Sequence, residues 1–288
     1  MTNSPISITM VEGKVKKLIR RRLLHTMKIK LEIIDRNNLV KAAQIAENEV
    51  TMMWNGAYEE GDHIVVTAEK ECDLVMYLDE TLGHTLVHYK APYCLNIPFV
   101  EQRTSYSLRA FADGRKCYRV RLADPRESEN YRNLCYNPYD YHENTGIYPH
   151  SKANVETRGE AVFASRNAMD GIIVNNSHGW FPYASWGINR NPDAEMYIDF
   201  GRDVTIDKVV FYNRADFPHD AWWTEGTIAF SDGSEETFSF VKTGEAQIFP
   251  IKERTIRTLT IKNLIKKEDD PSPFPALTQI EIWGRDAR

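Results

Sequence analysis

AEMYIDFGRDVTIDKVVFYNR, residues 194–214, contains two runs of alternating apolar and polar residues on either side of the turn Gly201-Arg202-Asp203. Alternation with a period of two is typical of a β-strand that has one face in a core and the other in solvent. Runs of the same kind continue to the C-terminus without a helical pattern between them, at residues 224–232, 235–242, 246–252, 255–264 and 277–284. About seven strands in roughly 130 residues predict a β-sandwich.

The N-terminal part of the chain shows the same strand pattern. Its alternating runs are residues 28–34, 63–69, 73–79, 85–90, 106–113 and 116–123. Asp113-Gly114 separates the last two runs, and an Asp-Gly pair in that position favours a hairpin, which we expect over residues 105–122.

One segment of this part has a helical pattern instead. In RNNLVKAAQIAENEV, residues 36–50, either Asn37 or Asn38 can cap a helix. The apolar positions of that helix are Leu39, Val40, Ala43, Ile45 and Ala46.

These patterns predict an all-β protein with two β-sandwich (jelly-roll) domains and one short helix near the N-terminus. A chain of 288 residues is long enough for two domains of ordinary size. Residues 123–158 have no strand alternation and are rich in Asn, Asp, Pro and Tyr, which indicates a connector that packs on its neighbours. We expect an N-terminal sandwich at 27–122, a Tyr-rich connector at 123–154 and a second jelly roll at 155–288.

The first 26 residues are basic and leave three interpretations open. They can form an amphipathic helix on an anionic surface or an unstructured arm. Alternatively, Met27 is the true start of the protein and the segment before it is an upstream extension. No function is assigned to this segment.

Charge and hydropathy limit the partners that we expect. The net charge is −5, and residues 1–30 hold eight cations against Glu12, so the rest of the chain carries −5 − 7 = −12. An acidic body repels phosphate backbones, so nucleic acid is not an expected partner. The sequence contains neither an apolar run of about 18 residues nor a signal peptide, which predicts no transmembrane segment and a cytoplasmic location.

The four cysteines, Cys72, Cys94, Cys117 and Cys135, contain no CxxC pair. A zinc ribbon or redox motif is therefore not expected. The spacing is compatible with two disulfides, but four ordinary thiols are the favoured interpretation because free Cys is commonly buried.

Four segments after residue 160 resemble the galactose-binding-like superfamily, which includes discoidin domains, coagulation-factor C-type domains and bacterial carbohydrate-binding modules. They are AVFASRNAMDGIIVNNSHGWFPYASWG (161–187), the stretch at 194–214, SDGSEETF (231–238) and ALTQIEIWG (276–284). They occur in the family's order over about 125 residues. The resemblance implies a jelly roll that binds a carbohydrate at loops on one end.

The loop at 213–223, NRADFPHDAWW, is the first candidate for that site. Planar groups such as guanidinium and carboxylate pair with sugar hydroxyls, and an aromatic face covers the C–H patch of a sugar ring. We expect Arg214, Asp216, His219 and Asp220 to contact hydroxyls while Trp222 or Trp223 stacks. The alternative is that the two tryptophans begin the next strand and that Asp216 pairs with Arg214.

A second candidate loop contains His178 and Trp180, with Asn189 further along the chain. Trp180 lies between Gly179 and Pro182 and is expected to be exposed. Trp186 is expected to plug the sandwich.

The resemblance also implies a structural Ca²⁺ ion. By motif position its side-chain ligands would be Asp170, Asn175 and Glu281, together with backbone carbonyls. Asp170 is equally suited to an Asx turn before Gly171.

Enzyme motifs such as GxSxG, HExxH and a Walker loop are absent from the sequence. His84 and His88 lie four residues apart on an expected strand and are interpreted as structural. The expected function is non-catalytic carbohydrate binding. The alternatives are a carbohydrate-active enzyme, with its active site in the N-terminal sandwich or at the domain interface, and a protein-interaction adaptor.

Overall fold

The computed structural model describes residues 26–214 and 221–287. The basic segment ahead of residue 26 and the candidate ligands Asp216, His219 and Asp220 lie outside the described residues. Within the described part the four cysteines are free thiols. No helix in that part is long and apolar enough to cross a bilayer.

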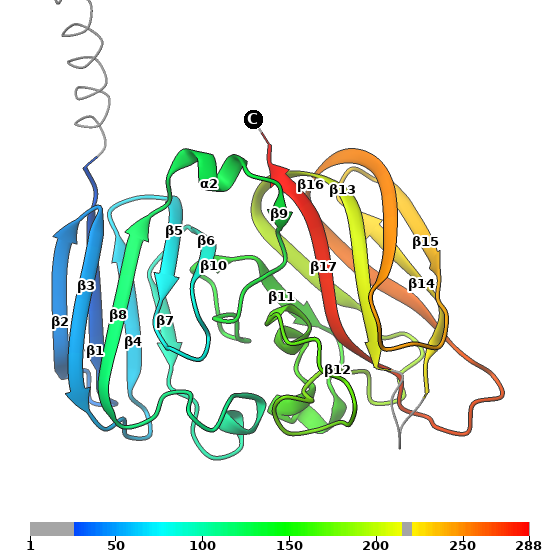
Figure 1. Ribbon diagram of the computed structural model, residues 1–288, viewed down its shortest axis with the longest axis horizontal. Coiled ribbons are helices and arrows are strands. Elements are labelled where there is room, and N and C mark those ends of the chain that lie inside the picture. The colour runs from blue at the N-terminus through cyan, green and yellow to red at the C-terminus, as the bar shows by residue number, and fades with distance from the viewer. Residues whose placement is uncertain (1–25, 215–220, 288) are drawn as a thin grey trace, which may run out of the picture.

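The N-terminal half is built from two antiparallel sheets. Its strands are β1 (Lys28–Ile34), β2 (Val40–Glu47), β3 (Glu49–Gly56), β4 (His63–Ala68), β5 (Cys72–Tyr77), β6 (Thr85–Tyr89), β7 (Tyr93–Asn96), β8 (Gly114–Leu122) and β10 (Ile147–Tyr148). One sheet has the order β2-β1-β4-β7 and the other the order β10-β6-β5-β8-β3. Alternate side chains such as Ile29, Leu31 and Val66 are fully buried in a core shared by the two sheets, which makes this half a sandwich (Figure 1).

The helix predicted over residues 36–50 is wrong, because this segment forms strand β2. Asp35 accepts hydrogen bonds from the backbone N–H groups of Asn37 and Leu39, both at 2.8 Å, and Asn38 has a φ of 63°. These contacts fold a tight turn that lays β2 against β1, with Lys28 opposite Glu47. Pairing with β1 therefore overrides the helical propensity of the alanine-rich sequence.

The hairpin predicted over residues 105–122 is also absent. Its second half is β8, but its first half is a loop, residues 106–113, that follows the 3-10 helix η1 (Gln102–Ser105). β8 pairs with β3 and β5 instead. Arg103 of η1 donates from Nη2 to the carbonyls of Leu108 and Ala110, and these contacts tie the loop, residues 106–113, to η1.

The C-terminal half is organised around three long strands. Its elements are η2 (Thr157–Gly159), η3 (Ala161–Phe163), η4 (Ser165–Met169), β12 (Trp186–Gly187), β13 (Met196–Arg214), β14 (Trp223–Phe230), β15 (Glu235–Ser239), β16 (Gln247–Lys266) and β17 (Ala276–Asp286). The strand order is β12-β17-β13-β16-β14-β15. β13 and β16 each join two strands that the sequence predicts separately. Their register shifts between Asp199 and Val204, and such bulges bend a strand. The sheet wraps around a second core that includes Trp186, Phe200 and Ile280.

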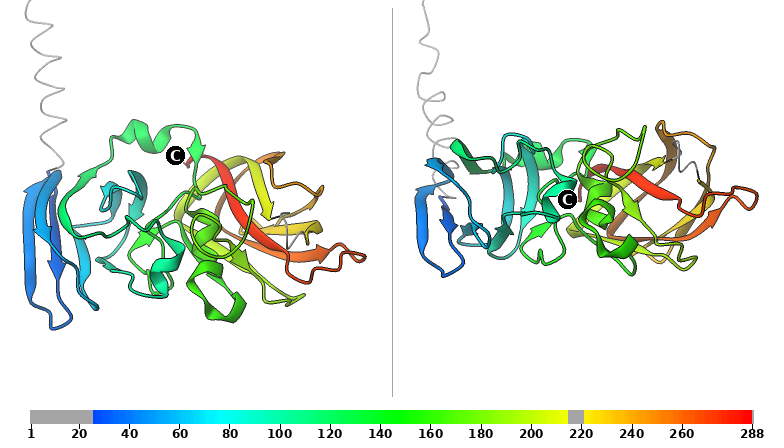
Figure 2. Two further views of the ribbon diagram at one scale, coloured as in Figure 1. Left: turned by 60° about the horizontal axis from the view of Figure 1, so that its bottom comes forward. Right: turned by 90° about the horizontal axis from the view of Figure 1, so that it is seen from below.

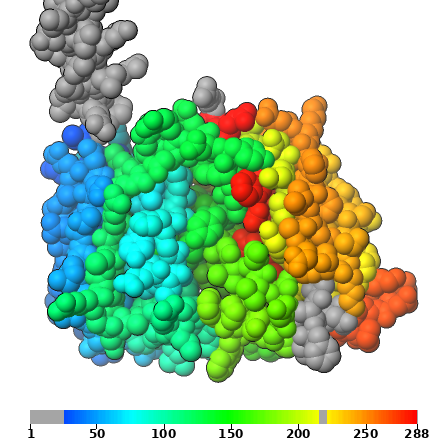
Figure 3. Space-filling model, viewed as in Figure 1, coloured from blue at the N-terminus to red at the C-terminus, as the bar shows by residue number. Residues whose placement is uncertain are grey.

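The connector contributes strands to both halves. It contains the α-helix α2 (Pro125–Glu129), β9 (Arg132–Asn133), β10 and β11 (His150–Ala153). β10 pairs with β6 of the N-terminal half, whereas β9 pairs with β17 and β11 with β13 of the C-terminal half. In Figure 3 this green segment fills the space between the blue-cyan and yellow-red halves.

Candidate functional site

Three strand ends meet at one end of the C-terminal sandwich, the lower end in Figure 1. Arg214, the last residue of β13, pairs with Ala276, the first residue of β17, and Ala276 also pairs with Gly187 at the end of β12. A cavity of about 160 Å³ opens here. We call it the Arg214 cavity. Its lining residues are Thr157, Arg158, Phe163, His178, Gly187, Ile188, Asn189, Arg214, Phe274, Pro275 and Ala276.

The guanidinium of Arg214 is held in a fixed orientation within this cavity. The residue is only 3% exposed. Its Nη2 donates to the carbonyl of Phe274 at 3.0 Å, and its Nη1 lies 3.5 Å from Oγ of Ser185. Arg214 therefore lines the cavity as a fixed positive charge, which favours an oxygen-rich ligand.

Aromatic rings and further cations form the rim of the cavity. The guanidinium of Arg190 lies 4.3 Å from the ring centroid of Phe274, and that of Arg158 lies 5.5 Å from the ring of Phe163. Arg158 also forms a bidentate pair with Glu160, whose hydrogen bonds hold the pKa of that carboxyl below its usual value. Both cations are thus positioned by neighbouring side chains.

Backbone contacts hold the loops of the rim together. Asn189 has a φ of 49°, and its backbone N–H donates to Oγ1 of Thr157 at 3.0 Å. Gly187 is required between them, because a Cβ there would lie 2.7 Å from the same Oγ1 and 3.1 Å from the ring of Phe163. Close packing of β12 against η2 and η3 therefore shapes the cavity.

A second hollow, of about 470 Å³, adjoins the first and shares Arg158, Phe163 and His178 with it. Trp180 lines this hollow and is 73% exposed. An exposed indole beside a hollow provides an apolar face for a ligand. His178 and Trp180, predicted as one candidate loop, are thus adjacent to Arg214 of the other.

The two adjacent tryptophans have different positions. Trp223, the first residue of β14, is 1% exposed and belongs to the core rather than to the rim, so its indole is not available to stack on a ligand. Trp222 is half-buried and packs against the same core. Trp186 is fully buried, as expected for the plug of the sandwich.

The three residues proposed for Ca²⁺ have separate protein partners. Oδ1 of Asp170 accepts from the backbone N–H of Ile172 at 2.8 Å, the Asx turn that the sequence allows. Asn175 donates to the carbonyl of Gly244, and Glu281 accepts from Nε1 of Trp283. No group of three His, Cys, Asp or Glu residues is arranged around a common point in residues 26–214 and 221–287. Burial raises the pKa of Asp170 to about 7.

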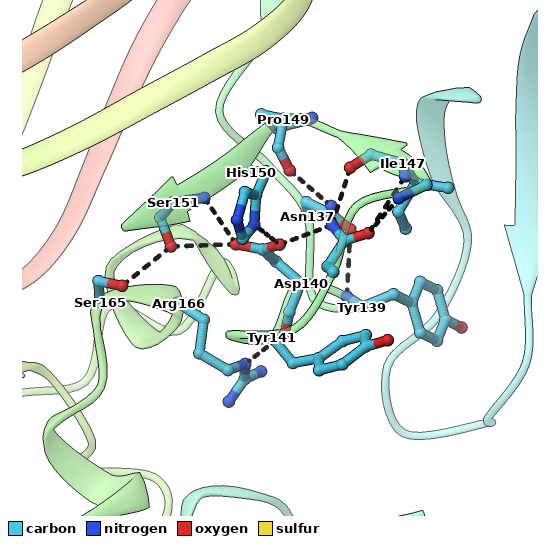
Figure 4. A network of polar contacts seen from close by, with 12 residues as sticks. Asn137, Tyr139, Asp140, Tyr141, Ile147, Pro149, His150, Ser151, Ser165 and Arg166 are labelled. Atoms are coloured by element: carbon cyan, nitrogen blue, oxygen red, sulfur yellow. Dashed lines mark hydrogen bonds and ion pairs between the residues drawn. The ribbon is translucent and has the colours of Figure 1, made fainter. Parts of the chain in front are cut away.

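A buried polar network in the connector was not identified from the sequence (Figure 4). Asp140 accepts from Nδ1 of His150 at 2.7 Å, and its other oxygen accepts from the N–H and Oγ of Ser151. Ser151 thus bonds to the carboxylate rather than to the imidazole, and all three residues are buried. A Ser-His-Asp triad requires a serine–histidine hydrogen bond, so this arrangement is structural. Arg166 ties it to η4 by donating to the carbonyl of Asp140.

Several cavity residues were not predicted. Thr157 and Arg158 lie in η2 and Phe274 lies in the loop before β17, about 115 residues further along the chain, and neither segment carries a motif. What these residues share is their position in space, because all three line the cavity beside Arg214. That adjacency becomes visible only with the strand order.

No protein-family model and no curated protein matches this sequence. Among solved structures, the Streptococcus pneumoniae fucose-binding module SpX-3 is 13% identical, covers 52% of this chain and 96% of its own, and has a TM-score of 0.38. The lectin domain of lectinolysin, solved with Lewis B antigen, is 14% identical over 54% of this chain and 98% of its own, with a TM-score of 0.40. The family 32 carbohydrate-binding module of C. perfringens NanJ, solved with galactose, is 13% identical, covers 46% of this chain and 91% of its own, and has a TM-score of 0.35. Because these likenesses are remote, the fold rests on the sheet order described above and the candidate site rests on this chain's own residues.

Proposed function

We propose that this chain binds carbohydrate without chemical turnover, through the Arg214 cavity and its rim. The observation that carries the proposal is the fixed guanidinium of Arg214 in a cavity bordered by the rings of Phe163 and Phe274. A sugar ring presents hydroxyls along its edge and C–H groups on its faces. A fixed cation beside aromatic rings is complementary to both features.

The size of the cavity supports a small occupant. At about 160 Å³ it is below the roughly 300–1,000 Å³ of sites for drug-sized ligands. It therefore suits one terminal sugar ring rather than the middle of a polymer. Thr157 and Asn189 add a hydroxyl and an amide to the same lining.

The described lining also favours binding over catalysis. Glycoside hydrolysis uses a pair of carboxylates, one on each side of the scissile bond. Among its described residues the Arg214 cavity has arginine, histidine, asparagine and threonine as polar groups. Glu160, at the neighbouring hollow, is engaged by Arg158.

Saturation-transfer NMR with a panel of neutral hexoses, deoxyhexoses, amino sugars and uronic acids tests this function. Arg214→Lys keeps the charge but loses the contacts to Phe274 and Ser185 that hold the cation in place, so affinity for the sugars that bind should fall at least tenfold, about 1.4 kcal/mol. Asn189→Ala should also weaken binding. Asn189 is exposed at the rim, so this variant tests the site without changing a buried side chain. Arg285→Ala, an exposed arginine of the same half, is the matched control.

Three outcomes contradict the proposal. Full binding by both Arg214→Lys and Asn189→Ala would place the sugar elsewhere. Release of reducing ends would identify the carbohydrate-active enzyme instead. No binding of any sugar in the panel would favour the protein-interaction adaptor.

A structural Ca²⁺ ion is a separate proposal. Asp170 would supply the side-chain ligand and loop carbonyls the rest, because Asn175 and Glu281 already have protein partners. Ca²⁺ should then raise the melting temperature of the wild type but not of Asp170→Asn. Equal melting temperatures with Ca²⁺ and with a chelator would contradict it.

A further inference from the structure

The N-terminal half contributes a large hollow to the same end of the molecule. It measures about 640 Å³ and is lined by the segment 78–81, by the start of β8 and by the loop at 106–113. Its polar lining includes Glu80, Thr81, Ser107, Arg109, Asp113 and Arg115. A lining that combines carboxylates, hydroxyls and guanidinium groups is suited to a ligand with many hydroxyl groups rather than to one with a single charge. We call it the β8 hollow.

The β8 hollow adjoins a hollow of the C-terminal half through one shared lining residue. Phe181 lines both the β8 hollow and the hollow that contains Trp180. The Trp180 hollow in turn shares His178 with the Arg214 cavity. By these shared residues the three spaces are neighbours in a series across both halves. The right panel of Figure 2 views the molecule from below, the end at which the Arg214 cavity opens.

The junction between the two halves is fixed at this point. The backbone N–H of Phe181 donates to the carbonyl of Thr104 in η1 at 2.9 Å, so the Trp180 loop is attached to the N-terminal half. The wall of the β8 hollow is also held in place, because Phe111 N–H donates to Oδ2 of Asp79 at 2.7 Å. A site that is already formed loses less entropy when a ligand binds.

We propose that the protein binds an oligosaccharide of several residues whose terminal sugar occupies the Arg214 cavity and whose following sugars pass over Trp180 and Phe181 into the β8 hollow. This inference rests on the proposed function, since it extends the site that would hold the terminal sugar. It gives the N-terminal half a role: its loop and β8 supply additional sugar-binding subsites. The exposed indole of Trp180 is the apolar platform between the two polar ends.

Calorimetric titration with size-graded manno-, galacto-, gluco- and chito-oligosaccharides of one to six residues tests the inference. The readout is the ratio of the Kd for the monosaccharide to the Kd for the tetrasaccharide in the series that binds. In the wild type we expect this ratio to be at least ten. Arg109→Ala combined with Arg115→Ala should lower it at least fivefold; both side chains are exposed, so folding is not at risk. Trp180→Ala should lower it as well.

A matched control and an internal reference make the result decisive. Arg119 lies on β8 four residues from Arg115, is exposed, and lies outside the lining of the β8 hollow, so Arg119→Ala should keep the wild-type ratio. Arg214→Lys should weaken binding at every chain length. A wild-type ratio near one, or a ratio unaffected by the Arg109 and Arg115 substitutions, would overturn the extended site while leaving the proposed function intact. Failure of every sugar to bind would instead reject the proposed function.

Discussion

The hydrogen bond between His142 and Glu156 holds the segment that leads into the Arg214 cavity. Nε2 of His142 lies 2.7 Å from Oε2 of Glu156, while Oε1 accepts from the backbone N–H of Ser165. The bond to Glu156 raises the pKa of His142. Burial alone would raise the pKa of Glu156, but the bonds from His142 and Ser165 hold it below its usual value.

These shifts predict how stability depends on pH. The stabilisation from His142 is fully present below its unfolded pKa of about 6.5 and is lost as pH rises through the higher folded value. The stabilisation from Glu156 is present above its unfolded pKa and is lost as pH falls through the lower folded value. His142→Gln should therefore lower the free energy of unfolding at pH 5.5 but not at pH 9, as measured by urea denaturation. Because His142 is 57% exposed, the loss should be below about 1 kcal/mol. An equal loss at both pH values would contradict this assignment.

At the same scale, the sequence identified the chemistry of individual residues better than their exposure. Arg214 and His178 were selected as ligand contacts, and both line one cavity. Trp223 was also selected, but it lies in the core. The residue type shows that an indole can either stack on a ligand or pack in the core. Which of the two occurs depends on the face of the sheet that the side chain occupies. Because β14 begins at Trp223, the sequence alone did not show which of Trp222 and Trp223 faces the core.

Among the elements, β13 shows how one glycine allows the two halves to approach each other. Gly201 has a φ of 73° and lies where the register shifts. A Cβ at this position would meet the ring of Tyr148 in β10 at 2.5 Å. β10 belongs to the N-terminal sheet, so this contact sets the separation between β13 and the other half.

Gly201→Ala should therefore destabilise the protein more than Gly233→Ala does. Both glycines have positive φ, which costs an alanine about 1–2 kcal/mol. A Cβ at Gly233 meets nothing within 4 Å, whereas at Gly201 it overpacks against Tyr148 and adds about 1–3 kcal/mol. Thermal unfolding of the two variants gives the comparison. Equal losses would show that Tyr148 moves aside freely.

Element type was predictable wherever alternation was long. The strands of the C-terminal half follow the sequence pattern, although β13 and β16 each join two runs across a bulge. The segments at 36–50 and 105–113 were not predictable, because their conformations depend on distant partners: β1 pairs with β2, and Asp79 holds the loop at Phe111. The loop at 106–113 forms part of the lining of the β8 hollow, so the hollow was not predictable from the sequence either.

At the scale of the whole molecule, the connector joins two cores that the sequence treats as separate domains. Tyr139 and Ile147 are buried in the N-terminal core, whereas Leu134 and Cys135 are buried in the C-terminal core. The hydroxyl of Tyr139 donates to the carbonyl of Gly83 at 2.8 Å and accepts from the N–H of Leu78 at 2.9 Å. Unfolding of either half would therefore expose part of the connector, whose other residues are buried in the core of the other half.

This sharing predicts that residues 27–288 unfold in one cooperative transition. In calorimetry the ratio of the calorimetric to the van't Hoff enthalpy should be near one. Tyr139→Phe keeps the ring but leaves a buried N–H without its acceptor, which costs about 1–3 kcal/mol. If the cores are coupled, the whole transition should move to a lower temperature and remain single. If the connector is only a linker, Tyr139→Phe should show two thermal transitions: one for the N-terminal half at a lowered temperature and one for the C-terminal half at the wild-type temperature. Coupling of the two cores would also keep the β8 hollow and the Arg214 cavity at a constant separation, which a single ligand that spans both hollows requires.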